Sequence, residues 1–374
     1  MIRNKNISIY LPIFFLFIIS IINLYNAKYL NSFYSNYYIK QIIWYILGIA
    51  IIFIIQKLNL KNIFKYSKYI YYANLLLLIL VLFIGEEING TRAWIDFKFF
   101  TFQPSEFMKL SLTLYLIEVS SRKENKLNNI FKLTILTLLP SLLVFLEPDT
   151  GAIIFFIIVY LFILITKKIK WYFYLIMGIL GITSLLLFIY FYLYNQDLLI
   201  NLIGTSFFYR VDRFINFRTN NYQLELSLIS IFGTPFIRNG FNKILLYIPE
   251  GATDFIFAFC AGNYGMLMAL LIIISYIILL IKISFKIKHS QNKKTNYLVI
   301  SFILILFFQI TINILMNIGL IPIVGITLPF LSYGGSSLMV NFLFLGIILN
   351  LTNKDGNRKA HSKNKNNLSK AYKD

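Results

Sequence analysis

The chain has 374 residues, of which 58% are hydrophobic and 13% charged, and its formal net charge is +20. A soluble domain is about half apolar and about a quarter charged, so an ordinary aqueous fold is excluded for most of this chain. The basic excess does not indicate nucleic-acid binding, because the Lys and Arg residues lie between apolar runs and form no basic helix with interleaved aromatic residues. Cys260 is the single cysteine, which excludes an internal disulfide and a cysteine metal site.

Ten apolar segments approach the roughly 20 residues that a helix needs to cross a bilayer. We expect spans at about 7–24, 39–55, 69–84, 107–119, 133–146, 152–165, 171–194, 255–281, 297–316 and 336–351. The alternating apolar and polar strands of a membrane barrel are not seen. The sequence therefore predicts an all-α polytopic membrane protein with about ten transmembrane helices.

The basic residues predict the orientation of these spans. An even number of spans places both termini on one side, and most Lys and Arg fall in the N-terminal arm, the even-numbered connections and the tail. Both termini are therefore expected in the cytoplasm. We expect residues 1–353 to form one membrane domain with a large outer loop at 195–254, and residues 354–374 to form a disordered basic cytoplasmic tail.

Two polar motifs lie between the third and fourth spans. They are Gly90-x-Arg92-x-Trp94 and Gln103-Pro104-Ser105-Glu106, the second followed by Lys109. Pro104 suits the first turn of a helix, so the fourth span is expected to begin there. Glu106 and Lys109 then share one helical face just inside the membrane, where an unpaired charge is costly. The pair is either a functional site or a structural ion pair that fixes this helix to its neighbours.

Further charged residues lie on the expected outer side. In the stretch 147–151, Asp149 either caps the start of the sixth span or contributes to a site. The large outer loop contains Arg210, Arg213 and Arg218, against the positive-inside trend. Guanidinium groups bind phosphate oxygens bidentately, so these arginines suit an anionic ligand, and pairing with lipid headgroups is the alternative.

The last two motifs precede the eighth and tenth spans. They are Pro249-Glu250-x-x-Thr253-Asp254-Phe255 and Ser332-Tyr333-Gly334-Gly335-Ser336-Ser337. Asp254 lies where water gives way to an apolar helix, so partial burial can raise its pKa to the range of a general base, and helix N-capping is the alternative role. The paired glycines and hydroxyls of the second motif permit a close approach, either of a ligand or of another helix.

Together these segments resemble the SEDS family of peptidoglycan glycosyltransferases, the RodA, FtsW and SpoVE proteins. The resemblance covers nearly the whole chain: ten spans, a large outer loop between the seventh and eighth, and the motifs in family order. The chain departs from the family pattern at Ala252, where His is usual, and at Gly262 and Asn263, where acidic residues are usual.

The resemblance implies that the protein polymerises lipid II into glycan strands on the outer face of the bacterial cytoplasmic membrane, with Asp254 as the catalytic residue. Asp254 would take the proton from the 4-hydroxyl of the acceptor GlcNAc while undecaprenyl diphosphate leaves. Positive charge, with a divalent cation such as Mg²⁺ or Mn²⁺ as a further candidate, would stabilise the departing diphosphate. The residues expected to bind substrate are Arg92, Trp94, Glu106, Lys109, Asp149, Arg210, Arg213, Glu250 and Ser332.

The resemblance also implies a partner, a class B penicillin-binding protein that supplies the transpeptidase. Two other functions stay open. One is a flippase for the lipid-linked precursor, in which Glu106 and Lys109 line the path of the headgroup. The other is a non-catalytic scaffold that positions the transpeptidase. The short N-terminal arm favours an elongation role, as in RodA, over a division role, as in FtsW.

Overall fold

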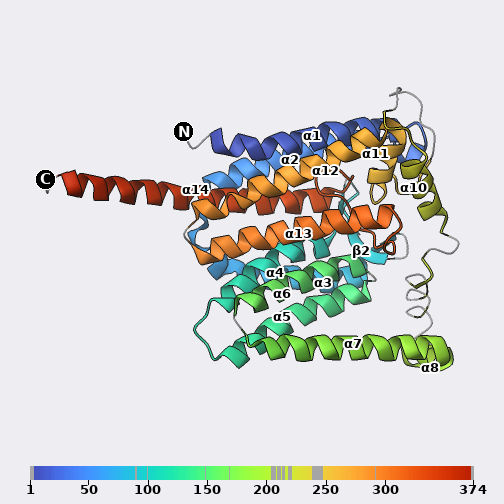
Figure 1. Cartoon of the computed structure of the whole chain (residues 1–374), viewed down its shortest axis with the longest axis horizontal. Helices are drawn as coiled ribbons and strands as arrows, with labels where there is room; N and C mark the ends of the chain where they lie inside the picture. Colours follow the sequence, from blue (N-terminus) through green and yellow to red (C-terminus); the bar gives the residue numbers. More distant parts are fainter. Residues whose placement is uncertain are drawn as a thin grey trace.

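The computed structural model describes residues 4–88, 91–98, 100–147, 149–167, 169–203, 208, 212, 215–217, 221–237, 247–290 and 292–371. Long helices run side by side along one axis, and both ends of the chain lie at the same end of the bundle (Figure 1). These helices are α1 (Asn4–Ala27), α2 (Tyr37–Lys57), α3 (Ile63–Ile84), α4 (Pro104–Ser120), α5 (Lys126–Leu146), α6 (Thr150–Thr166), α7 (Trp171–Tyr194), α12 (Met266–Ser284), α13 (Lys293–Asn317) and α14 (Gly335–Ala371). Shorter helices are α8 (Gln196–Ile203), α10 (Tyr222–Phe232) and α11 (Ile256–Tyr264).

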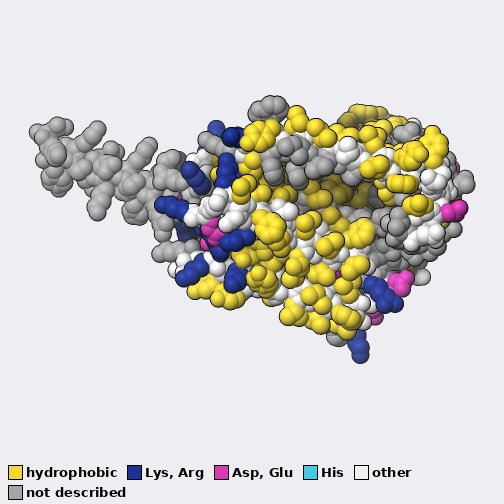
Figure 2. Space-filling model, turned by 90° about the horizontal axis from the view of Figure 1, so that it is seen from below, with side chains coloured by type: hydrophobic (Ala, Val, Ile, Leu, Met, Phe, Trp, Pro, Cys, Tyr) yellow, Lys and Arg dark blue, Asp and Glu magenta, His cyan; other side chains and the backbone are white. Residues whose placement is uncertain are grey.

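The helices have the length and surface of membrane spans. Among the described residues, seven are long and apolar enough to cross a bilayer: α1, α2, α3, α5, α12, α13 and the first part of α14. On the face shown in Figure 2, hydrophobic side chains cover the middle of the bundle, and Lys and Arg gather near the end from which α14 projects. An apolar belt of this kind is stable when it faces lipid chains. The protein is therefore a multi-pass all-α membrane protein, and each of the ten predicted segments falls on helical structure.

Three features differ from the sequence-based expectation. The predicted eighth span is two helices, α11 and α12, because Gly265 between them has a φ of 91° that breaks the helix. A small antiparallel sheet of β1 (Glu86–Ile88), β2 (Thr91–Asp96) and β3 (Thr101–Phe102) lies between α3 and α4. Finally, α14 continues as a helix to Ala371 and projects beyond the bundle (Figure 1), where a disordered tail was expected from residue 354. No proline interrupts this extension.

An irregular segment, residues 318–334, lies between α13 and α14, and its stretch from Leu328 to Ser332 is buried within the bundle. Backbone without regular structure needs hydrogen-bond partners in such surroundings. Four consecutive carbonyls, from Pro329 to Ser332, each accept a hydrogen bond from a side chain of another helix. The donors are Tyr276 of α12 (2.7 Å), Tyr45 of α2, Ser20 of α1 (2.6 Å) and Gln41 of α2 (3.1 Å). Three helices therefore hold this segment in one conformation beside the candidate site.

Candidate active site

Asp254 lies in the irregular stretch that precedes α11, outside the long helices. The residue at the N-cap of α11 is Phe255, and no side chain caps this helix, so the N-cap role considered for Asp254 is not supported. Glu250, at the start of the turn, has a positive φ of 55°. Its carboxylate accepts a hydrogen bond from Thr253 Oγ1 at 2.7 Å, and its carbonyl accepts one from the N–H of Phe255 at 3.0 Å. These bonds make 250–255 a compact turn that presents Asp254.

The surroundings of Asp254 raise the pKa of its carboxyl group. Burial, with smaller contributions from the negative charges of Glu250 and Asp149, raises the pKa of Asp254 from 3.8 to about 7. A carboxylate with a pKa near the working pH is both ionised in a large fraction of molecules and basic enough to accept a proton from a hydroxyl. The carboxyl groups of Asp254, Glu250 and Asp149, which come from two of the predicted motifs, therefore lie near one another.

The segment 324–327 brings two of these motifs together. A Cβ atom built on Gly325, which has a φ of +68°, would lie 3.7 Å from Asp254 Oδ2. On the other side, a Cβ atom on Gly151 of α6 would lie only 3.1 Å from the carbonyl oxygen of Val324. The start of α6 and the Asp254 turn therefore both pack against this segment. The missing Cβ atom at Gly151 permits the close contact with Val324, and the positive φ of Gly325 favours glycine there.

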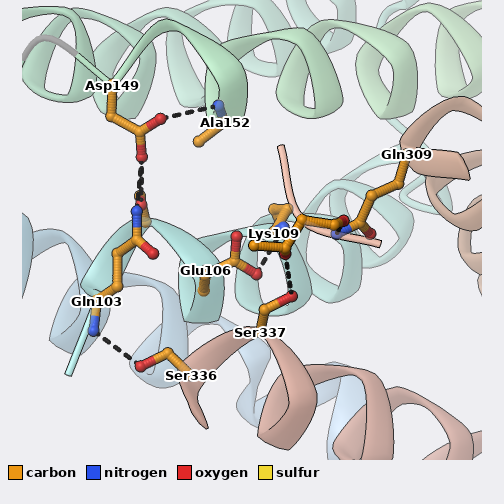
Figure 3. Close-up of polar contacts among 10 residues, drawn as sticks. Gln103, Glu106, Lys109, Asp149, Ala152, Gln309, Ser336 and Ser337 are labelled. Atoms are coloured by element: carbon orange, nitrogen blue, oxygen red, sulfur yellow. Dashed lines mark hydrogen bonds and ion pairs between the residues drawn. The ribbon is translucent and has the colours of Figure 1, made fainter. Parts of the chain in front are cut away.

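Asp149 caps α6 and joins it to α4 (Figure 3). Its Oδ1 accepts a hydrogen bond from the N–H of Ala152 at 3.4 Å, which confirms the N-cap alternative. Its Oδ2 accepts hydrogen bonds from Gln103 Nε2 and Ser105 Oγ, both at 2.9 Å. The N–H of Gln103 in turn donates to Ser336 Oγ of α14 at 3.0 Å. The predicted motifs of α4, α6 and α14 thus form one hydrogen-bonded network.

Glu106 and Lys109 form a buried ion pair in the first turns of α4 (Figure 3). Lys109 Nζ lies 2.6 Å from Glu106 Oε2, and the two side chains are 3% and 14% exposed. Lys109 Nζ also lies 4.9 Å from the centre of the Phe155 ring of α6. The helix begins at Pro104 and the two residues share a face, as predicted. Mutual neutralisation explains how both charges are buried, since each alone would carry a large desolvation cost.

The motif that opens α14 holds the Asp254 turn in place. Ser332 Oγ donates to the carbonyl of Thr253 at 2.6 Å and accepts from the N–H of Leu328 at 2.8 Å. The N–H of Tyr333 donates to the carbonyl of Ala252 at 3.0 Å. A Cβ atom on Gly335 would lie 2.5 Å from the Trp44 ring of α2, so this end of α14 is tightly packed. Close helix packing, the alternative to ligand binding, therefore explains Gly335. The Ser332 hydroxyl already donates one hydrogen bond and accepts another.

The remaining predicted residues lie on the small sheet or outside the described residues. Arg92 on β2 forms an ion pair with Glu87 at 3.7 Å, with both side chains 59% exposed, and Trp94 on the same strand is partly buried. Arg210, Arg213 and Arg218 lie outside the described residues. Within the part of the chain that the structure describes, no three His, Cys, Asp or Glu side chains form a group that could hold a metal ion.

Several side chains that hold the backbone around Asp254 were not singled out from the sequence. They are the buried polar residues Ser20, Gln41, Asn313 and Asn317, which bind backbone of the Asp254 turn or of the 318–334 segment. The available signal was a polar side chain inside an apolar span, and for the two asparagines a separation of four residues on one helical face.

Comparison with known proteins decides the family. The sequence model of the family described as "Cell cycle protein", FtsW/RodA/SpoVE, matches residues 6–357. The chain belongs to this family. The probable peptidoglycan glycosyltransferase FtsW of Coxiella burnetii is 32% identical over 337 residues, covering 84% of this chain and 86% of the relative. The protein of the same name from Nitrosomonas europaea is 33% identical over 334 residues, covering 85% and 83% of the two chains.

Solved structures share the fold of this chain. A chain in a peptidoglycan synthase complex, described for its coordination of polymerization and crosslinking, superposes with a TM-score of 0.77 at 23% identity, covering 93% of this chain and 97% of that one. The crystal structure of the rod shape determining protein RodA of Thermus thermophilus gives a TM-score of 0.66 at 24% identity, covering 93% and 96%.

Proposed function

We propose that the protein is a peptidoglycan glycosyltransferase that polymerises lipid II into glycan strands. The observation that carries the proposal is Asp254, a partly buried carboxyl with a pKa of about 7. It is presented by a turn that a hydrogen bond between Thr253 and Glu250 closes and that Ser332 holds in place. The sequence relatives named above as glycosyltransferases, more than 30% identical over most of their length, support the same activity.

The reaction transfers a growing glycan to a new acceptor. The 4-hydroxyl oxygen of the acceptor GlcNAc bonds to the anomeric carbon of the lipid-linked glycan, the bond from that carbon to the diphosphate oxygen breaks, and undecaprenyl diphosphate leaves. Asp254 takes the hydroxyl proton as the new bond forms. A diphosphate departs without protonation, so one carboxylate is sufficient where a glycosidase requires two.

The departing diphosphate requires positive charge, which the chain itself can supply. Lys109 is buried in α4 and paired with Glu106, and Arg210 and Arg213 belong to the large outer loop. We propose these three as the cationic groups. The described residues offer no cluster of three metal ligands, and the proposed reaction assigns no role to a divalent cation.

The charge distribution supports the proposed orientation. The Lys-rich end of the bundle, from which α14 projects, would face the cytoplasm under the positive-inside rule (Figure 2). The elements around the site, β2, α10 and α11, lie at the other end (Figure 1). The site would therefore open to the outer face of the bacterial cytoplasmic membrane, where polyprenyl-linked substrates reach it from the bilayer.

A class B penicillin-binding protein is the proposed partner, because the similar chain of the synthase complex comes from an assembly that couples polymerization to crosslinking. The relatives named above are FtsW proteins, which favours division over the elongation role expected from the short N-terminal arm. Localisation of a tagged copy decides between them: we expect it at the septum, and a sidewall distribution would indicate elongation.

The activity itself is tested with purified protein in liposomes and labelled lipid II. We expect wild-type protein to make a glycan polymer that a muramidase degrades. The Asp254→Ala variant should still bind lipid II and make no polymer. Translocation of lipid II without polymer would replace the proposal by a flippase. Normal growth and shape of cells that carry Asp254→Asn would replace it by a scaffold.

A further inference from the structure

Two asparagines of α13 contact the backbone of the proposed base. Asn313 Nδ2 donates to the carbonyl oxygen of Asp254 at 2.8 Å, and Asn317 Nδ2 donates to the same oxygen at 3.0 Å. The two residues are four apart, so their side chains lie on one face of the helix. Both side chains are fully buried, and both amide donors are therefore directed at a single backbone atom of Asp254.

The same amides also bind the two segments on either side of the base. Asn313 Nδ2 donates to the carbonyl of Ile326, in the segment that packs against the Asp254 carboxylate, at 2.6 Å. Asn317 Oδ1 accepts a hydrogen bond from the N–H of Ala258, in the first turn of α11, at 3.1 Å. That N–H has no partner within its own helix, because the first turn of a helix leaves its donors unpaired. One turn of α13 thus joins the Asp254 turn, α11 and the 324–327 segment.

This arrangement restrains the main chain of Asp254 and leaves its side chain available. Within the described part of the chain, the Asp254 carboxylate accepts no hydrogen bond, so its oxygens can meet an incoming hydroxyl. The efficiency of a general base depends on its position, and a displacement of about 1 Å can reduce the rate by about a hundredfold. We infer that Asn313 and Asn317 are positioning residues, which hold the Asp254 backbone so that the carboxylate reaches the acceptor hydroxyl. This inference rests on the proposed glycosyltransferase function.

A purely structural role for the two asparagines makes a different prediction, and the chain contains a matched control. Asn350 of α14 is 2% exposed, and its Nδ2 donates to two backbone carbonyls, those of Ile55 and Leu58 (3.0 Å), at the end of α2. It makes the same kind of bridge about 20 Å along α14 from the opening motif of that helix, given a rise of about 1.5 Å per residue. Its loss should affect stability and not the chemical step.

The test compares kcat, KM and Tm for Asn313→Ala, Asn317→Ala and Asn350→Ala in lipid II polymerisation by the full chain in liposomes. We expect kcat to fall about 10- to 100-fold in the first two variants, with KM within about twofold of wild type. Asn350→Ala should lower Tm to a similar extent and keep kcat. The inference is overturned if the α13 variants lose no more kcat than Asn350→Ala.

A second variant keeps the test decisive if an alanine variant does not fold. Asn317→Asp has nearly the same shape and keeps the oxygen that accepts the N–H of Ala258, but in its ionised form it cannot donate to Asp254 and adds a negative charge. We expect lower kcat and an acidic limb of the pH profile displaced to higher pH, since a neighbouring anion raises the pKa of Asp254. A wild-type kcat and profile would overturn the inference. Loss of activity in Asp254→Asn shows that the proposed function holds in either case.

Discussion

The rate of glycan polymerisation is expected to depend on pH through the ionisation of Asp254. Its pKa of about 7 results first from burial and then from the negative charge of Glu250. A base with that pKa is ionised in about a tenth of molecules at about pH 6 and about nine tenths at about pH 8. Because the ionised form takes the proton, kcat/KM should rise about tenfold over this interval and reach a plateau above it.

The contribution of Glu250 can be separated by the variant Glu250→Gln. Glutamine keeps an oxygen that can accept the Thr253 hydrogen bond, now 2.7 Å long, and removes the charge. The pKa of Asp254 should fall, because the ionised form is no longer opposed by a neighbouring anion, and the acidic limb should move to lower pH. The shape of the profile is the readout, so a change in substrate affinity does not obscure it.

The assay follows the initial rate of polymer formation from labelled lipid II at low substrate concentration, where kcat/KM reports the free enzyme. Buffers of constant ionic strength remove salt effects on the charged groups. A rate that is constant from about pH 6 to about pH 8 would refute the account, because an ordinary aspartate with a pKa near 3.8 is almost fully ionised over this interval.

Three predictions concern stability. Glu147, just after α5, is fully buried with no hydrogen-bond partner within the described residues, and burial, with the charge of Asp149, raises its pKa from 4.5 to about 9. Between pH 4.5 and about 9 the unfolded chain loses the Glu147 proton and the folded chain keeps it, so the free energy of unfolding should fall by up to about 1.4 kcal/mol per pH unit. Glu147→Gln should remove this pH dependence of Tm, and the same pH dependence in wild type and variant would contradict the prediction. Lys109→Met should cost about 3–5 kcal/mol by leaving Glu106 buried without its partner, and the double variant with Glu106→Gln should recover most of this loss in Tm. Gly265→Ala should cost about 1–3 kcal/mol because φ is 91° there, whereas Gly178→Ala in α7, with open space around it, should not destabilise.

The spans and the site motifs could be predicted from the sequence because they depend on local properties. A long apolar run predicts a membrane helix whatever its neighbours are, and Pro104 marked the start of α4 correctly. The motif residues Asp149, Glu106 and Lys109 lie in the polar network or ion pair that their positions suggested. The N-cap of α6 by Asp149 is likewise a short-range interaction, so the sequence could indicate it as one of two roles for this residue.

The interactions that assemble the site could not be predicted because their partners are far apart in the chain. The carbonyls of the 318–334 segment are bound by α1, α2 and α12, and no period in the sequence relates Gln41 to Ser332. The break at Gly265 depends on a single φ angle, and glycine is also tolerated inside membrane helices. The small sheet between α3 and α4 consists of strands of two to six residues, too short for a clear alternation of polarity.

The central claim, that Asp254 is the base of a glycan polymerase, is tested most directly by Asp254→Asn in the purified reaction. Asparagine has nearly the same shape and cannot take the proton, so polymerisation should fall by at least about a hundredfold, while the Kd for lipid II and the Tm stay close to wild type. Asp355→Asn, which removes a carboxylate hydrogen-bonded to Ser290 after the apolar part of α14, should keep the wild-type rate. Polymer formation by Asp254→Asn at the wild-type rate would contradict the account.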